Sequence, residues 1–281
     1  MFKIGDFNDL KVVREASFGF FLDAGTGNTS DDILLPNAST LHKEIKVDDV
    51  VHAFIYRDSK DRLVATLQTP LAKVEEIAYL KVKAITNVGA FVDIGLERDV
   101  LVPMKEQKYN LEKDKSYLFY IYEDKTGRLA ATTDISPYLD FMEDAALGQE
   151  VTGIIYGFQT NDSLMVAVEG KYEGVVLKNE YFTDIKPGEE LNFRVKKIYE
   201  DGRLGLTPRG KKLDERDVLS EKILKYLEDN NGVMPFNDKS SPEAIKREFN
   251  TSKNYFKIAL GGLMRKKLIE QNEEGTKLIK K

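Results

Sequence analysis

The chain has 281 residues, of which 42% are hydrophobic and 32% are charged, so it is long enough for several domains and too apolar for a disordered chain. It contains no cysteine, which excludes disulfides and thiolate metal sites. Its two histidines, His42 and His52, leave almost no basis for Ser-His-Asp or Cys-His catalysis.

The N-terminal segment MFKIGDFNDL has no apolar stretch of the signal-peptide kind. No run in the chain approaches the roughly 18 apolar residues that a membrane-spanning helix needs. We therefore expect a cytoplasmic protein with no membrane partner.

Charge is divided unevenly along the chain. Residues 1–192 hold 21 Lys and Arg against 33 Asp and Glu, whereas residues 193–281 hold 21 against 14. The two parts carry −12 and +7, which together give the net charge of −5. A basic end on an acidic chain indicates a polyanionic partner at that end, and the alternative is a surface imbalance without function.

The first part of the chain repeats one pattern three times. The segments GFFLDAG (19–25), GAFVDIG (89–95) and LMVAVEG (164–170) correspond, as do DRLVATLQ, GRLAATTD and GRLGLTPR further along. Each copy predicts five short strands with period-two alternation and no room for a long helix, which is typical of a small closed barrel. The predicted barrels cover residues 1–70, 71–136 and 146–212.

Alternation also predicts which side chains face outward. In the second copy it places Val92 in the core and turns Phe91 outward, and in the first copy it turns Phe21 outward. An outward aromatic on a small barrel predicts a stacking platform for unpaired bases, worth roughly 1–3 kcal/mol per base. The alternative is a ring that packs under a neighbouring domain.

Two further expectations concern the edges of this platform. A bulge at Gly19 is expected to bring Phe18 onto the same outer face as Phe21. In the third copy Val166 is expected at the position of Phe91, so no aromatic platform is predicted there.

Residues 213–281 predict a different domain. Apolar residues at helical spacing predict a first helix that ends at Asn231, and Ser241 with Pro242 predicts the start of a second. A third helix and two short strands follow. This is the order of a winged helix-turn-helix. Lys253 and Lys257 lie near the start of the third helix, where a recognition helix contacts nucleic acid.

The motif ITNVGAFVDIG, followed by VLVP and YEDKTGRL, resembles the S1 RNA-binding domain, which is an OB-fold barrel. Three such barrels followed by a winged helix resemble the bacterial conserved virulence factor B family over nearly the whole chain, with the third repeat the weakest match. The resemblance implies a non-catalytic RNA-binding protein in post-transcriptional regulation of virulence genes.

The resemblance also implies site residues, because S1 domains bind RNA with aromatics around the second strand and with an Asp and an Arg that flank the last turn. The matching residues are Phe18, Phe21, Asp58 and Arg62 in the first repeat, Phe91, Asp124 and Arg128 in the second, and Arg203 in the third.

Most of the affinity for RNA is expected from cations of the third barrel and of the C-terminal domain that follows it. The first two barrels are expected to add weak stacking. These cations are Arg194, Lys196, Lys197, Arg203, Arg209, Lys211, Lys212, Lys253 and Lys257.

Single-stranded RNA is the favoured partner, and we expect no cofactor, no metal and no enzymatic activity. The segment AGTGNTSDD (24–32) contains G-x-G, but no predicted helix follows it, so a dinucleotide site is not expected. Two alternatives stay open: a DNA-binding transcription regulator that works through the winged helix, and a ribosome-associated scaffold. For the scaffold, Tyr255, Phe256 and Met264 could form a docking patch, although their spacing is also that of a core.

Overall fold

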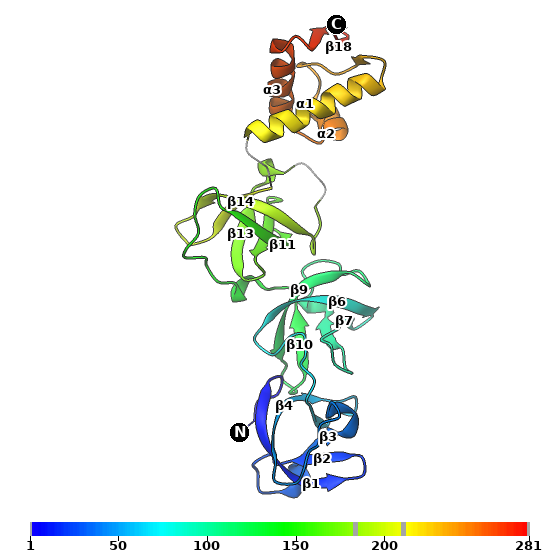
Figure 1. Ribbon diagram of the computed structural model, residues 1–281, viewed down its shortest axis with the longest axis vertical. Coiled ribbons are helices and arrows are strands. Elements are labelled where there is room, and N and C mark those ends of the chain that lie inside the picture. The colour runs from blue at the N-terminus through cyan, green and yellow to red at the C-terminus, as the bar shows by residue number, and fades with distance from the viewer. Residues whose placement is uncertain (1, 182–184, 209–211, 280–281) are drawn as a thin grey trace.

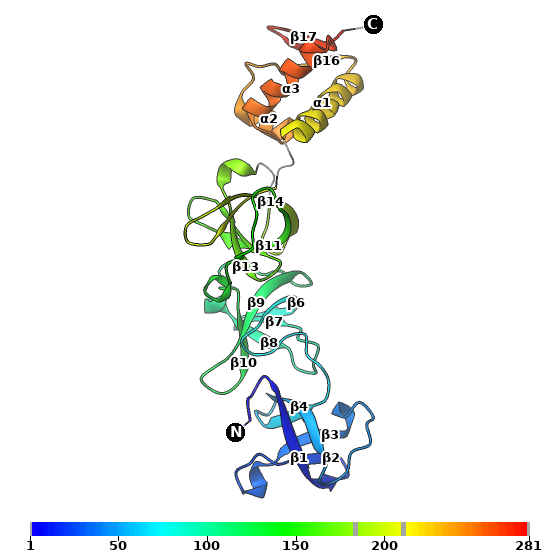
Figure 2. The same cartoon turned by 60° about the vertical axis from the view of Figure 1, so that its left-hand side comes forward.

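The computed structural model describes residues 2–181, 185–208 and 212–279. Three closed five-stranded barrels and a helical domain with a small sheet follow one another along the chain (Figure 1). Both views show them end to end, with the helical domain farthest from the N-terminus (Figure 2). The predicted fold, three OB-fold barrels and a winged helix, is confirmed.

The strands of each barrel lie where the repeat pattern predicts them. Barrel 1 consists of β1 (Phe7–Ala16), β2 (Gly19–Leu22), β3 (Ile33–Pro36), β4 (Val50–Arg57) and β5 (Leu63–Thr66). Barrel 2 consists of β6 (Ile77–Thr86), β7 (Gly89–Val92), β8 (Val100–Pro103), β9 (Ser116–Glu123) and β10 (Leu129–Thr132). Barrel 3 consists of β11 (Glu150–Phe158), β12 (Leu164–Val168), β13 (Tyr172–Val176), β14 (Glu190–Ile198) and β15 (Leu204–Thr207).

Each barrel closes in the same way, through one parallel pair between its third and fifth strands. In barrel 1 the pair is β3 with β5, and β8 with β10 and β13 with β15 correspond to it. Single 3-10 turns follow the third strand of each barrel at Asn37–Ser39, Met104–Glu106 and Lys178–Glu180, and others lie at Thr29–Asp31 and Ser136–Tyr138.

The bulge expected at Gly19 lies elsewhere. The register of β1 with β2 shifts between Val12 and Arg14, so the extra residue is Val13. The same shift recurs in barrels 2 and 3, at residues 83 and 156. Residues that are two apart on a regular strand share a face. The inserted Val13 breaks this alternation, so that Val12 lies in the core and Arg14 is exposed to solvent.

Barrels 1 and 2 pack against each other through apolar side chains on their outer faces. Phe54, Tyr56 and Val64 of barrel 1 are buried in one cluster with Leu96 and Leu129 of barrel 2. Burial of such a patch stabilises the contact by about 25 cal/mol for each Å² of apolar surface removed from water. The relative placement of these two barrels is therefore fixed by packing as well as by the linker.

Barrels 2 and 3 are joined by a second apolar cluster. Leu118 and Tyr120 of β9 lie against Ile154 and Tyr156 of β11, and the linker residue Ile135 is fully buried between them. The phenol of Tyr120 also stacks on the ring of Tyr138 in the linker. Burial raises the pKa of Tyr156 to about 12.

The winged helix contains α1 (Lys212–Asp229), α2 (Pro242–Phe249), α3 (Lys253–Arg265) and a sheet of β16 (Val233–Met234), β17 (Ile269–Asn272) and β18 (Gly275–Leu278). The side chain of Ser241 accepts from the Ala244 N–H, so the predicted start of α2 is confirmed, and the side chain of Ser252 caps α3 by accepting from the Tyr255 N–H. The short strand β16 was not predicted. Among the described residues, no helix is long and apolar enough to cross a membrane.

Candidate nucleic-acid interface

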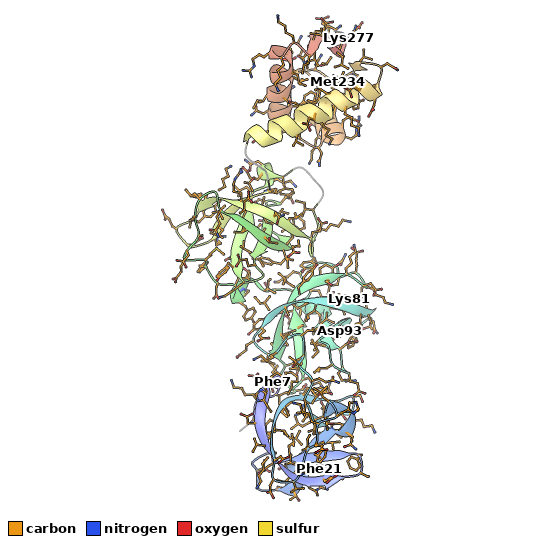
Figure 3. The ribbon with its side chains drawn as sticks, in the orientation of Figure 1. Phe7, Phe21, Lys81, Asp93, Met234 and Lys277 are labelled. Carbon is orange, nitrogen blue, oxygen red and sulfur yellow. The ribbon has the colours of Figure 1, made fainter. Side chains whose placement is uncertain are left out.

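The outward aromatics of barrels 1 and 2 occupy the same register. Phe21 lies opposite Leu34 of β3, and Phe91 lies opposite Leu101 of β8. The neighbouring Val92 is fully buried, whereas both phenylalanines are half-buried on the outer face. Figure 3 shows Phe21 toward the end of barrel 1 that is remote from barrel 2. The predicted alternation is therefore confirmed.

Phe18 lies in the two-residue turn between β1 and β2, and its side chain is 57% exposed. Its ring meets that of Phe21 edge-on, with 6.0 Å between centroids. Thus Phe18 and Phe21 do come together, although the turn rather than a bulge at Gly19 brings this about. Barrel 2 carries Val88 at the turn, and its side chain is 55% exposed.

In barrel 3 the position of the platform differs from the expected one. Register places Met165 opposite Gly157, as Phe91 lies opposite Ala84, whereas Val166 is fully buried in the core. The prediction for Val166 is therefore wrong by one residue. It aligned Gly170 with Gly95, but barrel 3 holds one residue more between Val166 and Gly170 than barrel 2 holds between the equivalent Val92 and Gly95. Met165 packs into the cluster between barrels 2 and 3, so this part of barrel 3 is covered.

The Asp and Arg residues of the last hairpin stabilise their own turns. One carboxylate oxygen of Asp58 accepts from the backbone N–H groups of Lys60 and Arg62, and the other accepts from the Arg62 guanidinium at 2.9 and 2.6 Å. Partial burial raises the pKa of Asp58, but these hydrogen bonds outweigh it and the pKa is lowered. Asp124 likewise accepts from the backbone N–H groups of Thr126 and Arg128.

The guanidinium of Arg128 pairs with a carboxylate of the neighbouring barrel and not with Asp124. Its Nε donates to Asp61 of barrel 1 at 2.9 Å, and Nε of Arg57 donates to the carbonyl of Gly127 at 3.1 Å. The hydrogen bond from Arg128 lowers the pKa of Asp61. The β4–β5 and β9–β10 loops therefore touch, and the predicted residues of two barrels form one surface at their junction.

The corresponding loop of barrel 3 has a different composition. Tyr199 stands where Asp58 and Asp124 stand, since its N–H bonds the carbonyl of Arg203 as theirs bond the carbonyls of Arg62 and Arg128. Nζ of Lys197 lies 4.4 Å from the centroid of the Tyr199 ring. The guanidinium of Arg203 is held by Asp201 at 2.8 Å. Tyr199 was not predicted from the sequence, because matching YEDGR to YEDKTGR by its first letters pairs Tyr199 with Tyr122. Only alignment on the shared Gly-Arg places Tyr199 at the position of Asp124.

Several predicted cations of the C-terminal part have partners within the protein. Lys196 bonds the carboxylate of Glu180, a residue that is only 8% exposed, at 2.6 Å. Lys253 donates from Nζ to the carbonyl of Lys239 at 3.2 Å, whereas Lys257 is exposed on α3. Arg209 and Lys211 lie outside the described residues, as does the side chain of Lys212.

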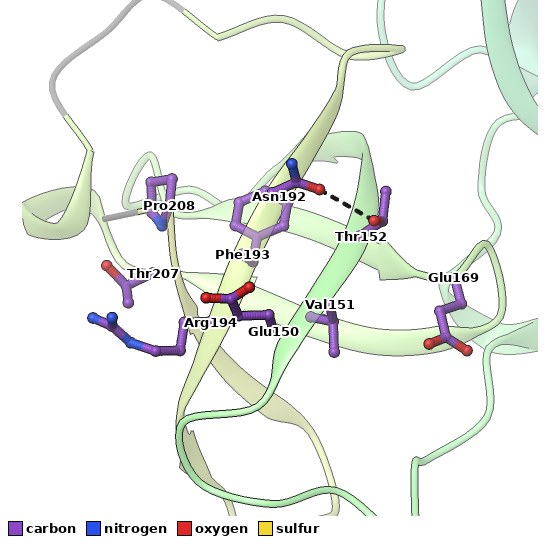
Figure 4. A pocket seen from close by; sticks show the side chains of 9 residues that line it. All are labelled: Glu150, Val151, Thr152, Glu169, Asn192, Phe193, Arg194, Thr207 and Pro208. Atoms are coloured by element: carbon purple, nitrogen blue, oxygen red, sulfur yellow. Dashed lines mark hydrogen bonds between the residues drawn. The ribbon is translucent and has the colours of Figure 1, made fainter. Parts of the chain in front are cut away.

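Arg194 lines an open pocket of about 510 Å³ that lies over the paired strands β11 and β14 (Figure 4). The pocket also contains Glu150, Glu169 and Asn192, and the amide of Asn192 meets the Thr152 hydroxyl at 3.2 Å. Because two carboxylates and one guanidinium line this pocket, its surface is a poor match for a polyanion.

The docking patch considered for α3 is not formed as expected. Phe256 is fully buried and Tyr255 packs against the same core, so two of the three residues belong to the interior. Met264 is 39% exposed and Ile258 45% exposed. Among the described residues, no group of three or more His, Cys, Asp or Glu could hold a metal ion.

Comparison with known proteins agrees with this architecture. An S1 domain model matches residues 4–68 and 76–134, and a CvfB-like winged helix domain model matches residues 221–278. A Bacillus subtilis (strain 168) protein, uncharacterized protein YitL, is 33% identical over 94% of this chain and 90% of its own length. Conserved virulence factor B of Staphylococcus epidermidis (strain ATCC 12228) is 31% identical over 81% of this chain and 79% of its own.

The chain belongs to the conserved virulence factor B family. A crystal structure from Streptococcus pneumoniae TIGR4, described as a multidomain protein with nucleic acid binding domains, matches 98% of both chains with a TM-score of 0.53 and 25% identity. The domain composition of this family member is that of a non-catalytic nucleic-acid-binding protein.

Proposed function

We propose that this protein binds single-stranded RNA with little sequence preference, without catalytic activity, and acts in the cytoplasm in post-transcriptional regulation. The observation that carries the proposal is the recurrence of Phe21 and Phe91 at one register on the outer faces of two barrels. Every base has a π-face, so aromatic platforms hold unpaired bases of any identity. The name conserved virulence factor B, which the Staphylococcus epidermidis relative carries, supports a role connected with virulence.

The contacts described above favour barrels 1 and 2 for stacking. The platform position of barrel 3 is Met165, which packs against barrel 2. Phosphate contacts are available on the same two barrels, because their junction exposes Arg62 and Arg128, whose side chains are 61% and 58% exposed. Lys60 and Lys125 are exposed on the same two loops. The C-terminal cations add long-range attraction for the polyanion.

Two sets of substitutions in the full-length protein test whether aromatic side chains supply stacking and C-terminal cations supply long-range attraction. The first, Phe18→Ala with Phe21→Ala and Phe91→Ala, removes stacking, and the second, Arg203→Gln with Lys253→Gln and Lys257→Gln, removes charge. Dissociation constants for a single-stranded oligoribonucleotide are measured from low to moderate salt. We expect the first set to lose affinity at all salt concentrations, and the second to lose it mainly at low salt and to flatten the salt dependence.

Leu71→Ala serves as a control, because Leu71 is 63% exposed on the linker between barrels 1 and 2 and belongs to neither set. Unchanged binding by both sets, with the fold retained, would contradict the proposal. Loss from the charge set alone would show that the aromatics do not hold bases.

A protein partner is the second candidate, and the surface of α3 favours it over duplex DNA. The exposed face of α3 presents Ile258 and Met264, and the wing tip carries Glu273 and Glu274. Carboxylates at the wing repel phosphates, and aliphatic side chains read few base edges. Competition with excess duplex DNA tests the DNA alternative, and co-sedimentation with nuclease-treated ribosomes tests the scaffold.

A further inference from the structure

The ring of Phe21 is already covered by another side chain. Cζ of Arg14 lies 3.7 Å from the centroid of the Phe21 ring, which is the distance of direct cation–π stacking. Arg14 belongs to β1 and lies directly opposite Phe21 in the register of β1 with β2. A base cannot reach this face of the ring without displacing the guanidinium.

Arg14 faces outward because of the bulge at Val13. On a regular strand, with Val13 paired like its neighbours, Arg14 would share the inward face of Val12, which is fully buried. The guanidinium makes no ion pair with a carboxylate of the described residues, in contrast to the paired Arg128 and Arg203. Its positive charge is therefore available to an anionic ligand.

Phe18 flanks this stack from a turn that is held in place. The N–H of Asn37 bonds the carbonyl of Phe18 at 3.1 Å, and the Asn37 amide donates to the carbonyl of Ser17 at 3.0 Å. The backbone of the turn is thus fixed while the ring stays exposed. Side chains that are ordered before binding lose less entropy when a ligand arrives.

We propose that an unpaired nucleobase of the RNA stacks on the outer face of the Arg14 guanidinium, with Phe18 beside it and Phe21 beneath the guanidinium. This rests on the proposed RNA-binding function and names the contact surface in barrel 1. A planar guanidinium stacks on bases and also attracts the neighbouring phosphate, so one side chain supplies both interactions. Phe21 acts as a positioning residue that holds Arg14 flat.

Barrel 2 provides an internal comparison. It carries Ala84 opposite Phe91, where barrel 1 carries Arg14 opposite Phe21, and Val88 in place of Phe18. Barrel 2 therefore has the lower ring without the guanidinium above it. We infer that barrel 1 is the stronger base-stacking site of the two.

The test uses the full-length protein and a fluorescein-labelled single-stranded oligoribonucleotide of mixed sequence, about 12 nucleotides long, a length within the range that OB folds bind. Arg14→Lys keeps the charge but removes the planar group. We expect a loss of affinity on the order of tenfold with an unchanged salt slope. Arg14→Gln is expected to lose affinity and also to reduce the slope. Lys11→Gln, which removes a charge from the same strand, controls for bulk electrostatics.

A gain-of-function variant guards against loss through misfolding. Ala84→Arg with Val88→Phe builds the barrel 1 arrangement in barrel 2 and is expected to tighten binding several-fold, whereas Ala84→Lys with Val88→Phe is expected to tighten it less. Wild-type affinity in Arg14→Lys would overturn the inference, as would equal gains from the two barrel 2 variants. Failure of the wild-type protein to bind the oligoribonucleotide would instead overturn the proposed function.

Discussion

Nε of Arg128 in barrel 2 donates to the carboxylate of Asp61 in barrel 1 at 2.9 Å. An arginine that the S1 resemblance assigns to RNA is thus held by a carboxylate of the neighbouring barrel. A phosphate that approaches Arg128 must compete with Asp61, so RNA binding at this loop is linked to the contact between the barrels.

Asp61→Asn therefore tests competition for Arg128. The amide oxygen still accepts a hydrogen bond but carries no charge, so Arg128 is freer to meet a phosphate. We expect tighter binding of single-stranded RNA and a salt slope steeper by at most about 0.7, the value for one added phosphate contact. Asp48→Asn, which frees Lys11 on barrel 1, is the matched control. Weaker binding by Asp61→Asn would contradict the competition.

The Asp61 contact also predicts a pH dependence. Because the hydrogen bond from Arg128 lowers the pKa of Asp61, the contact stabilises the junction above the usual aspartate pKa of about 3.9 and is lost as the pH falls through the lowered value. A carboxyl-carbon NMR titration should place the midpoint of Asp61 below that value, and in Arg128→Gln it should return toward it. An identical midpoint in the two proteins would show that Arg128 is not the cause.

Period-two alternation was sufficient to predict the barrels and the outward rings, because it depends only on which residues are apolar. The bulges were missed because the inserted residues, Val13, Lys83 and Tyr156, share no chemical property. That miss hid Arg14. The platform of barrel 3 was misplaced for another reason, because barrel 3 holds one residue more than barrel 2 between the buried Val166 or Val92 and the glycine that follows it. A bulge is set by strand pairing across the barrel, which local sequence does not report.

Contacts between domains could not be predicted from the sequence either. Whether Arg128 meets Asp124 in its own loop or Asp61 in the next barrel depends on how two folded surfaces pack. The helix cap at Ser241 was predictable because a cap involves residues within one turn.

Leu118 links barrel 2 to barrel 3, and its replacement should uncouple them. Its side chain is 2% exposed in the cluster between the barrels, whereas Leu80 is equally buried inside barrel 2. Leu118→Ala and Leu80→Ala are each expected to cost about 2–5 kcal/mol of unfolding free energy. Differential scanning calorimetry should separate the unfolding of barrel 3 from that of barrel 2 only in Leu118→Ala. A similar separation in Leu80→Ala would contradict a specific role for the interface.

Gly89 is required by a close approach between two strands. A Cβ at this position would lie 2.2 Å from the carbonyl oxygen of Val102, and the backbone φ is +150°. Gly25 has φ of +73° with nothing within 4 Å of its Cβ position, so alanine there meets strain without a clash. We expect Gly25→Ala to cost about 1–2 kcal/mol and Gly89→Ala clearly more, because strands β7 and β8 must separate. Urea unfolding followed by circular dichroism measures both, and equal losses would mean that the carbonyl of Val102 moves aside freely.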